Sequence, residues 1–257
     1  MKTLYPFLSF FCVGCEILDK ISYQDSFVQV SSGHKHSCAI DRNNHVQCWG
    51  ANFSGQASPP DSEFTQVSVG ESHSCAIGTN GITQCWGLED DNRLAVPEIH
   101  FQQISAGAAH SCGIDQDNCA HCWGNDEYGQ LTPPDERIEF RQITTGYSHT
   151  CGITLRSEVV CWGDNSWDAT IPPDERFVQV SAGVNYVCGI TTAGKIECWG
   201  NNDHGQCSFP DGSYYQVTAG YRHACAIDTD YNVVCWGNDD YGQATPDEIS
   251  PWDGVFH

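Results

Sequence analysis

A pair of cysteines recurs six times along this chain at an almost constant spacing. Nine residues separate the two members of each pair, and successive pairs begin 37, 37, 39, 37 and 37 residues apart. The pairs are Cys38 and Cys48, Cys75 and Cys85, Cys112 and Cys122, Cys151 and Cys161, Cys188 and Cys198, and Cys225 and Cys235. A period of this length is typical of repeat architectures, in which each unit becomes stable only by stacking on its neighbours. The repeats, residues 27–250, are therefore expected to form one domain.

Each repeat contains three short runs with the composition of β-strands. In residues 177–213, "FVQVSAG" alternates apolar and polar residues, and "YVCGI" and "KIECWG" are β-rich runs on either side of the turn sequence "TTAG". No run has the spacing of an amphipathic helix, which disfavours helical solenoids and leucine-rich repeats. Three antiparallel strands per repeat, with room for a short fourth, predict an all-β fold of the β-propeller type.

The tryptophan that follows the second cysteine of each pair is predicted to lie in the core of its blade. It recurs identically in every repeat, which is what a packing residue does and a binding residue has no reason to do. These residues are Trp49, Trp86, Trp123, Trp162, Trp199 and Trp236.

The paired cysteines are predicted to form disulfides. The two members of a pair flank a hairpin turn, so in register they face each other across adjacent strands at a distance that a disulfide can bridge. Zinc would need four ligands, and no repeat offers a second close Cys or His pair. Cys119 and Cys207 fall outside the pattern, and their spacing leaves open whether they pair with each other or stay free.

Cysteine content and the N-terminus favour a location outside the cytoplasm. Sixteen cysteines are a poor fit to a reducing compartment. Lys2 precedes an apolar run at 4–13, which has the length of a signal peptide and is too short to cross a bilayer as a helix. Residues 1–14 are therefore predicted to be a signal peptide.

The sequence "CVGC" at 12–15 resembles the lipobox of bacterial lipoproteins. That resemblance implies a lipid on Cys15, followed by a tether at 15–26. Cys12 stands where the lipobox usually has leucine, so ordinary secretion remains open. We expect a cell-surface or periplasmic lipoprotein, or otherwise a secreted protein, with membrane contact only through the lipid.

The charge balance bears on the partner. There are 33 acidic residues against 11 basic ones, a net charge of −22. Nucleic-acid binding needs clustered basic residues, so a nucleic-acid partner is not expected. A positively charged protein or divalent cations would be attracted instead.

The motif "GxxHSCAI…CWGxNxxGQ" resembles the regulator of chromosome condensation repeat family over residues 27–250. Gly-x-x-His occurs in five repeats and departs to "GVNY" at 183–186; Gly-Gln is kept in four repeats and lost at 92–93 and 168–169. The resemblance implies a propeller, typically of seven blades. Six full repeats are present, and "SPWDGVFH" at the C-terminus resembles the lead-in "PPDSEFTQ" of a further repeat. Two arrangements stay open, a six-bladed ring, which we favour, and an incomplete seven-bladed one in which 251–257 starts the seventh repeat.

Five histidines would lie at equivalent positions around such a ring: His36, His73, His110, His149 and His223. We expect buried residues whose ring nitrogens bond nearby backbone, because the spacing between blades usually exceeds metal-ligand distances. We predict neither a metal nor a cofactor.

Positions that vary among the repeats are the better candidates for recognition. The residues four positions beyond the glycine of Cys-Trp-Gly are Ser54, Asp91, Tyr128, Trp167, His204 and Tyr241. By repeat symmetry they share one face of the ring, and loops on a rigid scaffold commonly carry recognition. We predict that Tyr128, Trp167, His204 and Tyr241 form a binding surface. The alternative is that these side chains pack on neighbouring loops.

No nucleophile elbow, phosphate-binding glycine loop or HExxH motif is present, so the chain is not expected to be an enzyme. The sequence predicts a non-catalytic, extracytoplasmic protein-binding propeller. One alternative is an exchange factor for a small GTPase or a chromatin-type regulator, as in the eukaryotic family member. Another is a glycan-binding or hydrolytic propeller.

Overall fold

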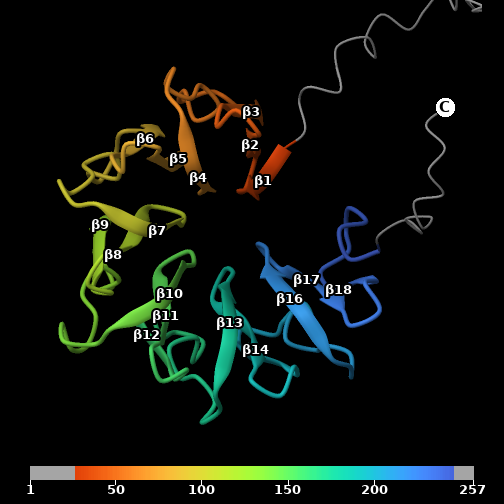
Figure 1. Ribbon diagram of the computed structural model, residues 1–257. Helices are drawn as coiled ribbons and strands as arrows, with labels where there is room; N and C mark the ends of the chain where they lie inside the picture. The colour runs from red at the N-terminus through yellow and green to blue at the C-terminus, as the bar shows by residue number, and fades with distance from the viewer. Residues whose placement is uncertain (1–26, 246–257) are drawn as a thin grey trace, which may run out of the picture.

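The computed structural model describes residues 27–245, which form six three-stranded antiparallel sheets arranged as blades around a central axis (Figure 1). The predicted signal peptide, the tether with Cys15, and residues 251–257 lie outside this range. The strands are, in blade 1, β1 (Phe27–Ser32), β2 (His36–Asp41) and β3 (Val46–Gly50); in blade 2, β4 (Phe64–Val69), β5 (His73–Gly78) and β6 (Thr83–Gly87); in blade 3, β7 (Phe101–Ala106), β8 (His110–Asp115) and β9 (Ala120–Gly124); in blade 4, β10 (Phe140–Thr145), β11 (His149–Thr154) and β12 (Val159–Gly163); in blade 5, β13 (Phe177–Ala182), β14 (Tyr186–Thr191) and β15 (Ile196–Gly200); and in blade 6, β16 (Tyr214–Ala219), β17 (His223–Asp228) and β18 (Val233–Gly237).

The predicted all-β propeller is confirmed, with three strands in each blade. The first strand of each blade lies nearest the axis, and the second strand pairs with both of its neighbours (Figure 1). The fourth strand for which the sequence left room is not formed in residues 27–245. That stretch is instead a loop that leads to the next blade.

All six predicted cysteine pairs are disulfides. Each pair is directly opposed in the register of the second and third strands, with Cα atoms 4.0 to 4.1 Å apart. Each bond therefore joins the two strands of one hairpin. Cys119 and Cys207 are free thiols and lie in blade 3 and in the loop after blade 5.

The glycine of Cys-Trp-Gly is required by the backbone. Gly200 has φ +102°, and a Cβ there would lie 2.5 Å from the carbonyl oxygen of Asn185. Side chains rarely adopt this conformation, so the chain can turn away from the third strand only at glycine. The motif thus marks the point where each blade ends and its loop begins.

The hydrophobic core lies between the blades. In each of five clusters, a cysteine and an isoleucine from the second strand of one blade pack against residues of the next blade. Between blades 1 and 2, Cys38 and Ile40 contact the cluster of Phe64, Val67 and Trp86. A single blade cannot bury these groups, which explains why the repeats must stack.

A ladder of glutamine side chains joins the first strands of adjacent blades. The Gln29 amide donates to the carbonyl oxygen of Val67 at 3.1 Å and accepts from its N–H at 2.9 Å. The same double bond links Gln66 to Ile104, Gln103 to Ile143, Gln142 to Val180, and Gln179 to Val217. Each glutamine side chain therefore makes the pair of backbone hydrogen bonds that a neighbouring β-strand would otherwise make.

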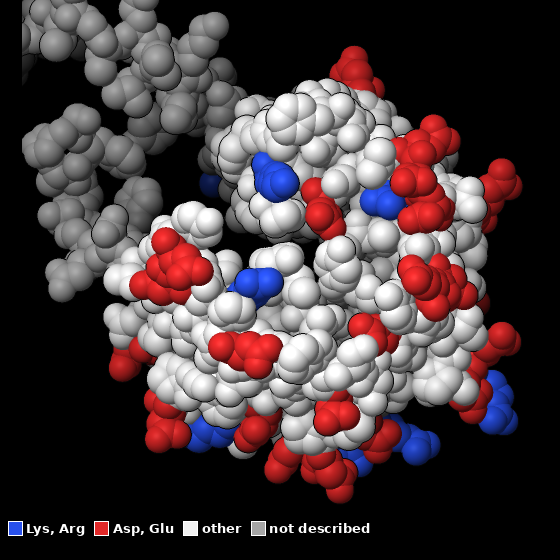
Figure 2. Space-filling model, turned by 180° about the vertical axis from the view of Figure 1, so that it is seen from behind, with Lys and Arg blue, Asp and Glu red and all other residues white. Residues whose placement is uncertain are grey.

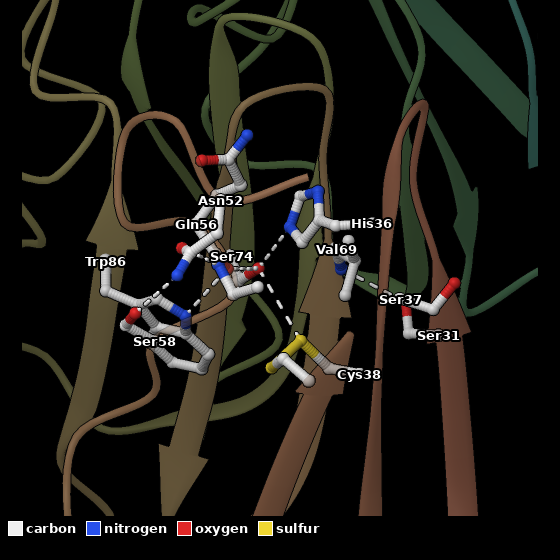
Figure 3. Close-up of a disulfide and its surroundings, with 12 residues drawn as sticks. Ser31, His36, Ser37, Cys38, Asn52, Gln56, Ser58, Val69, Ser74 and Trp86 are labelled. Carbon is white, nitrogen blue, oxygen red and sulfur yellow. Dashed lines mark hydrogen bonds between the residues drawn. A yellow bond between two sulfur atoms is a disulfide. The ribbon is translucent and has the colours of Figure 1, made fainter. Parts of the chain in front are cut away.

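Histidines of the Gly-x-x-His motif also join adjacent blades, but not through the expected hydrogen bonds to the backbone. His36 Nε2 lies 2.7 Å from the hydroxyl of Ser74 in the next blade, which itself donates to the carbonyl oxygen of Gln56 (Figure 3). Since the hydroxyl has only one hydrogen, the imidazole Nε2–H must be the donor. His73 and His110 contact Ser111 and Thr150 in the same way. The expected partner was wrong because the side-chain hydroxyl of the adjacent blade lies closer to the ring.

Blade 4 breaks this pattern. Among the described residues, His149 is fully buried with no hydrogen-bond partner on either ring nitrogen, because Val187 stands where blades 2, 3 and 4 have Ser74, Ser111 and Thr150. In place of the next histidine, Tyr186 donates its hydroxyl hydrogen to the carbonyl oxygen of His223.

Replacing Val187 with threonine is therefore expected to stabilise the protein. The new hydroxyl can accept from His149 and donate to the carbonyl oxygen of Ala169, which satisfies a buried polar group at almost constant volume. We expect the free energy of unfolding to rise by about 1 kcal/mol, which is roughly 2 to 4 °C in Tm for a chain of this size. The matched control is Val180→Thr, at an equally buried position in an apolar cluster, which should lower Tm. An unchanged or lower Tm for Val187→Thr would contradict the prediction.

Within residues 27–245, no blade precedes blade 1, and the ring is not closed (Figure 1). Five of the six tryptophans are 5 to 8% exposed, as predicted for core residues, whereas Trp49 is 51% exposed. The prediction was wrong for Trp49. The indole of each blade packs against the preceding blade, and the described chain has no blade before blade 1. Phe27 and Val30 are exposed for the same reason. Blades 1 and 6 touch at the inner rim, where His34 and Tyr221 stack with ring centroids 5.2 Å apart.

Candidate binding face

Two sets of loops lie on one face of the ring, which we call the loop face. One set is the turns between the first and second strands, which contain the Gly-x-x-His motifs. The other is the loops after Cys-Trp-Gly, and their starts are bonded to those turns: Asn125 N–H donates to the carbonyl oxygen of Ala109, and Asn201 N–H donates to that of Asn185. Equivalent bonds occur in all six blades. Variable positions of both loop sets are therefore presented together.

A glutamine side chain holds the backbone at four of the six variable loop positions. Gln130 is 1% exposed; its side chain accepts from the N–H of Tyr128 at 2.9 Å and donates to Asn125 at 2.8 Å. Its carbonyl oxygen accepts from the indole of Trp162. The Gly-Gln motif thus fixes a tight loop while the side chain two residues earlier points to solvent. Ser54, His204 and Tyr241 are held in the same way by Gln56, Gln206 and Gln243.

The four predicted binding residues are exposed. Tyr128 is 49%, Trp167 45% and Tyr241 94% exposed, and His204 is exposed as well. Trp167 lies in a loop without the glutamine, where Asp168 adopts φ 58°. Among the described residues, no aromatic ring stacks on Tyr128, Trp167 or Tyr241 within the loop face, so these side chains are available for contact. Tyr128, Trp167, His204 and Tyr241 extend from the loops that follow blades 3, 4, 5 and 6, respectively.

The sequence reasoning missed a second group of residues on this face. Tyr147 and Tyr221 occupy the first variable position of Gly-x-x-His in blades 4 and 6 and are 44% and 43% exposed. The guanidinium of Arg222 lies 5.2 Å from the Tyr221 ring centroid, a cation–π distance. The signal was available, because this position varies among repeats just as the chosen one does. It is occupied by His34, Glu71, Ala108, Tyr147, Val184 and Tyr221.

A groove of about 390 Å³ brings the two groups together across blades 2 to 4. Tyr128 and Tyr147 line it with the carboxylates of Glu71 and Glu127. Arg93 also lines the groove, but it is buried and its guanidinium lies 3.4 Å from Asp91. The groove therefore combines two aromatic rings with two carboxylates that no arginine or lysine neutralises among the described residues.

A central cavity of about 370 Å³ is lined by all six blades. Its wall is made by the glycines of Gly-x-x-His. A Cβ on Gly107 or Gly183 would lie 2.5 Å from the carbonyl oxygen of the equivalent glycine in the next blade, Gly146 or Gly220. Close approach of the backbones around the axis therefore requires glycine at this position.

Charge on the molecule is mainly acidic. Acidic side chains cover much of the periphery, and basic ones are few (Figure 2).

Within residues 27–245, no group of three or more His, Cys, Asp or Glu side chains is placed to hold a metal ion. The described part of the chain has no helix long and apolar enough to cross a membrane. Burial raises the pKa of the Cys207 thiol to about 12, so this cysteine is not an activated nucleophile.

A family model described as regulator of chromosome condensation (RCC1) repeat matches residues 27–56, 101–130, 140–166, 177–206 and 215–243. A search of curated protein sequences found no significant match.

Solved structures of similar fold include the CRINKLY WD40 ectodomain of the receptor kinase ACR4 from Arabidopsis thaliana. It is 27% identical, with a TM-score of 0.71, over 83% of this chain and 80% of that one. The ectodomain of the receptor kinase CR4 from Physcomitrella patens is 24% identical, with a TM-score of 0.72, over 83% of this chain and 62% of that one. Yeast RCC1 (Prp20), in its complex with Kap60, is 15% identical, with a TM-score of 0.72, over 83% of this chain and 70% of that one.

Proposed function

We propose, since this chain belongs to the regulator of chromosome condensation (RCC1) repeat family, that it is a non-catalytic protein-binding propeller that acts outside the cytoplasm through its loop face. The observation that carries the proposal is the combination of rigid loops with exposed aromatic tips. Gln130, which is buried, and Gln243, which is half-buried, order the backbone at Tyr128 and Tyr241 before any partner binds. Binding then costs less loop ordering, and Tyr and Trp are the residues enriched at interface hot spots.

The groove suggests the chemistry of the partner. Two tyrosine rings beside Glu71 and Glu127 suit an arginine or lysine side chain, which gains both cation–π and ionic contacts. The net charge of −22 would also speed the approach of a basic surface. We therefore propose a partner that is a protein with a basic loop or patch.

Disulfides support an extracytoplasmic location. Six disulfides in a chain of 257 residues require an oxidising environment to form and persist. The two plant receptor kinases resemble this chain through their ectodomains. We propose further that processing after residue 14 leaves Cys15 as a lipid-bearing N-terminus. Cys15→Ser should then move the protein from the membrane fraction to the soluble one; an unchanged membrane fraction would contradict this.

Substitution of the groove tyrosines is expected to weaken partner capture strongly. The oxidised mature protein and its Tyr128→Ala, Tyr147→Ala double variant would be cross-linked to cell-surface extract, and captured proteins would be quantified by mass spectrometry. Loss of hot-spot side chains should reduce capture of the specific partner at least about tenfold, and 0.5 M salt should weaken the wild-type capture.

The matched control is Tyr231→Ala, an exposed tyrosine in the hairpin turn of blade 6 at the opposite face. It should leave capture unchanged. A partner that is retained by the groove variant and lost by the control would place the binding site on the opposite face and contradict the proposal.

A further inference from the structure

The central cavity and the groove meet on the loop face. Glu71, Ala108 and Tyr147 line both of them. All three residues belong to turns between first and second strands, so the cavity opens at the end of the axis where the loop face lies. A partner segment that occupies the groove therefore lies at the mouth of the central cavity.

The wall of the central cavity is largely apolar. Ala108 and Val184 contribute apolar surface at its mouth, and Glu71 is the one carboxylate among residues 27–245 that lines it. No lysine or arginine of the described chain does so. The last residue of every first strand is small, which leaves the space at the axis open. These residues are Ser32, Val69, Ala106, Thr145, Ala182 and Ala219.

The mouth of the central cavity is held in shape by contacts between neighbouring turns. The ring of His34 stacks on that of Tyr221, with centroids 5.2 Å apart and planes 13° apart. On its other side, His34 Nδ1 lies 3.5 Å from Glu71 Oε1. The carboxylate of Glu71 is therefore positioned at the boundary between the cavity and the groove. A mouth that is ordered in the free protein lowers the entropic cost of binding.

We propose that the central cavity is a second binding pocket, which takes a leucine, isoleucine or methionine side chain of the partner segment whose lysine or arginine binds the groove. This inference rests on the proposed function of the loop face. The volume of about 370 Å³ lies within the range of ligand pockets, and removal of the apolar side chain from water drives its binding. Because the two sites share a wall, the basic and the apolar residue are within about three positions of each other, as alternate side chains on one side of an extended segment are.

Selection of random peptides displayed on phage, with the oxidised protein as bait, tests this pocket. The enriched peptides should carry lysine or arginine close to leucine, isoleucine or methionine. They should bind a Val184→Tyr variant at least about tenfold more weakly, because the new ring occupies the mouth of the cavity. The fold accommodates this change, since Tyr147 and Tyr221 stand at the equivalent position and line the same cavity.

The matched control is Val178→Tyr, the same substitution in the same blade. Val178 is 46% exposed on β13, outside the loop face, and blade 6 has Tyr215 at the equivalent position. This variant should bind the enriched peptides as the unaltered protein does. A diazirine analogue of leucine at the apolar position of a peptide should cross-link to residues 182–184 or 218–221. Cross-links confined to other parts of the loop face would overturn the proposal.

A Tyr128→Ala variant separates the two sites, because Tyr128 lines the groove and not the central cavity. Peptides that lose affinity for this variant but bind Val184→Tyr at full strength would overturn the second pocket and leave the proposed function intact. Peptides that bind the Tyr128→Ala, Tyr147→Ala double variant at full strength would instead contradict the proposed function.

Discussion

Reduction of the six hairpin disulfides is expected to unfold the propeller near room temperature. Each bond closes a loop of nine intervening residues, which stabilises the fold by about 2 to 3 kcal/mol in the chain-entropy account. Six such closures together amount to about 12 kcal/mol or more, which is as large as the whole stability of an ordinary domain. The cysteines of blades 1 to 5 also lie in the inter-blade clusters, so each of these five hairpins loosens two blades when it opens.

Thermal unfolding followed by circular dichroism, with and without a phosphine reductant, measures this effect. The reduced protein should show no cooperative transition above about 25 °C, whereas the oxidised one should melt cooperatively. A Cys119→Ser, Cys207→Ser double variant is the control, because it removes the two free thiols and should keep the oxidised Tm. The prediction fails if mass spectrometry finds all disulfides reduced and Tm is still unchanged.

Mild acid is expected to destabilise the protein well before its carboxylates are protonated. Burial is the main cause that lowers the pKa of His73 and His110 to about 3 and that of His149 to about 4. Neighbouring positive charge adds to the effect at His73 and His110, while Asp164 opposes it at His149. In the unfolded chain these imidazoles take up protons near pH 6.5, so the unfolded state binds more protons below that pH.

The stability that these three histidines contribute is therefore complete above about pH 7 and is lost as the pH falls from 6.5 towards 4. With three protons taken up on unfolding, the slope approaches about 4 kcal/mol per pH unit below pH 5.5. Denaturant titrations of the oxidised protein at pH 7.5, 6.5, 5.5 and 4.5 would measure it. In the folded protein, the ring resonances of His73 and His110 should not titrate between pH 7 and 5. A free energy of unfolding that is constant down to pH 4.5 would contradict the prediction.

What could be predicted from the sequence is what the repeats share. The strand count, the cysteine pairing and the burial of five tryptophans all follow from positions that recur in every unit. Four of the five histidines are buried as expected, whereas His223 is partly exposed. The hydrogen-bond partners of the buried histidines do not follow from the sequence of one repeat, because Ser74 and Ser111 belong to a different repeat from the histidine that they contact. A contact between units is invisible when one unit is read alone.

Departures from the repeat were harder to predict for a related reason. Trp49 has the sequence of a core residue, and only its place at the start of the ring exposes it. From the sequence, Val187 is an ordinary strand residue. Only the structure shows that it leaves the ring of His149 without a hydrogen-bond partner. Tyr147 and Tyr221 share the loop face with Tyr128. This could be predicted only if it were known that two different turns lie at the same end of a blade.

The glutamine ladder has a consequence for how this protein could have arisen. Every internal blade offers a glutamine on one side and a bare strand backbone on the other, and both halves are the same from unit to unit. A unit of 37 residues duplicated or lost by recombination would meet neighbours that already fit it. Blade number can therefore change in a single genetic event, without any new contact having to be selected.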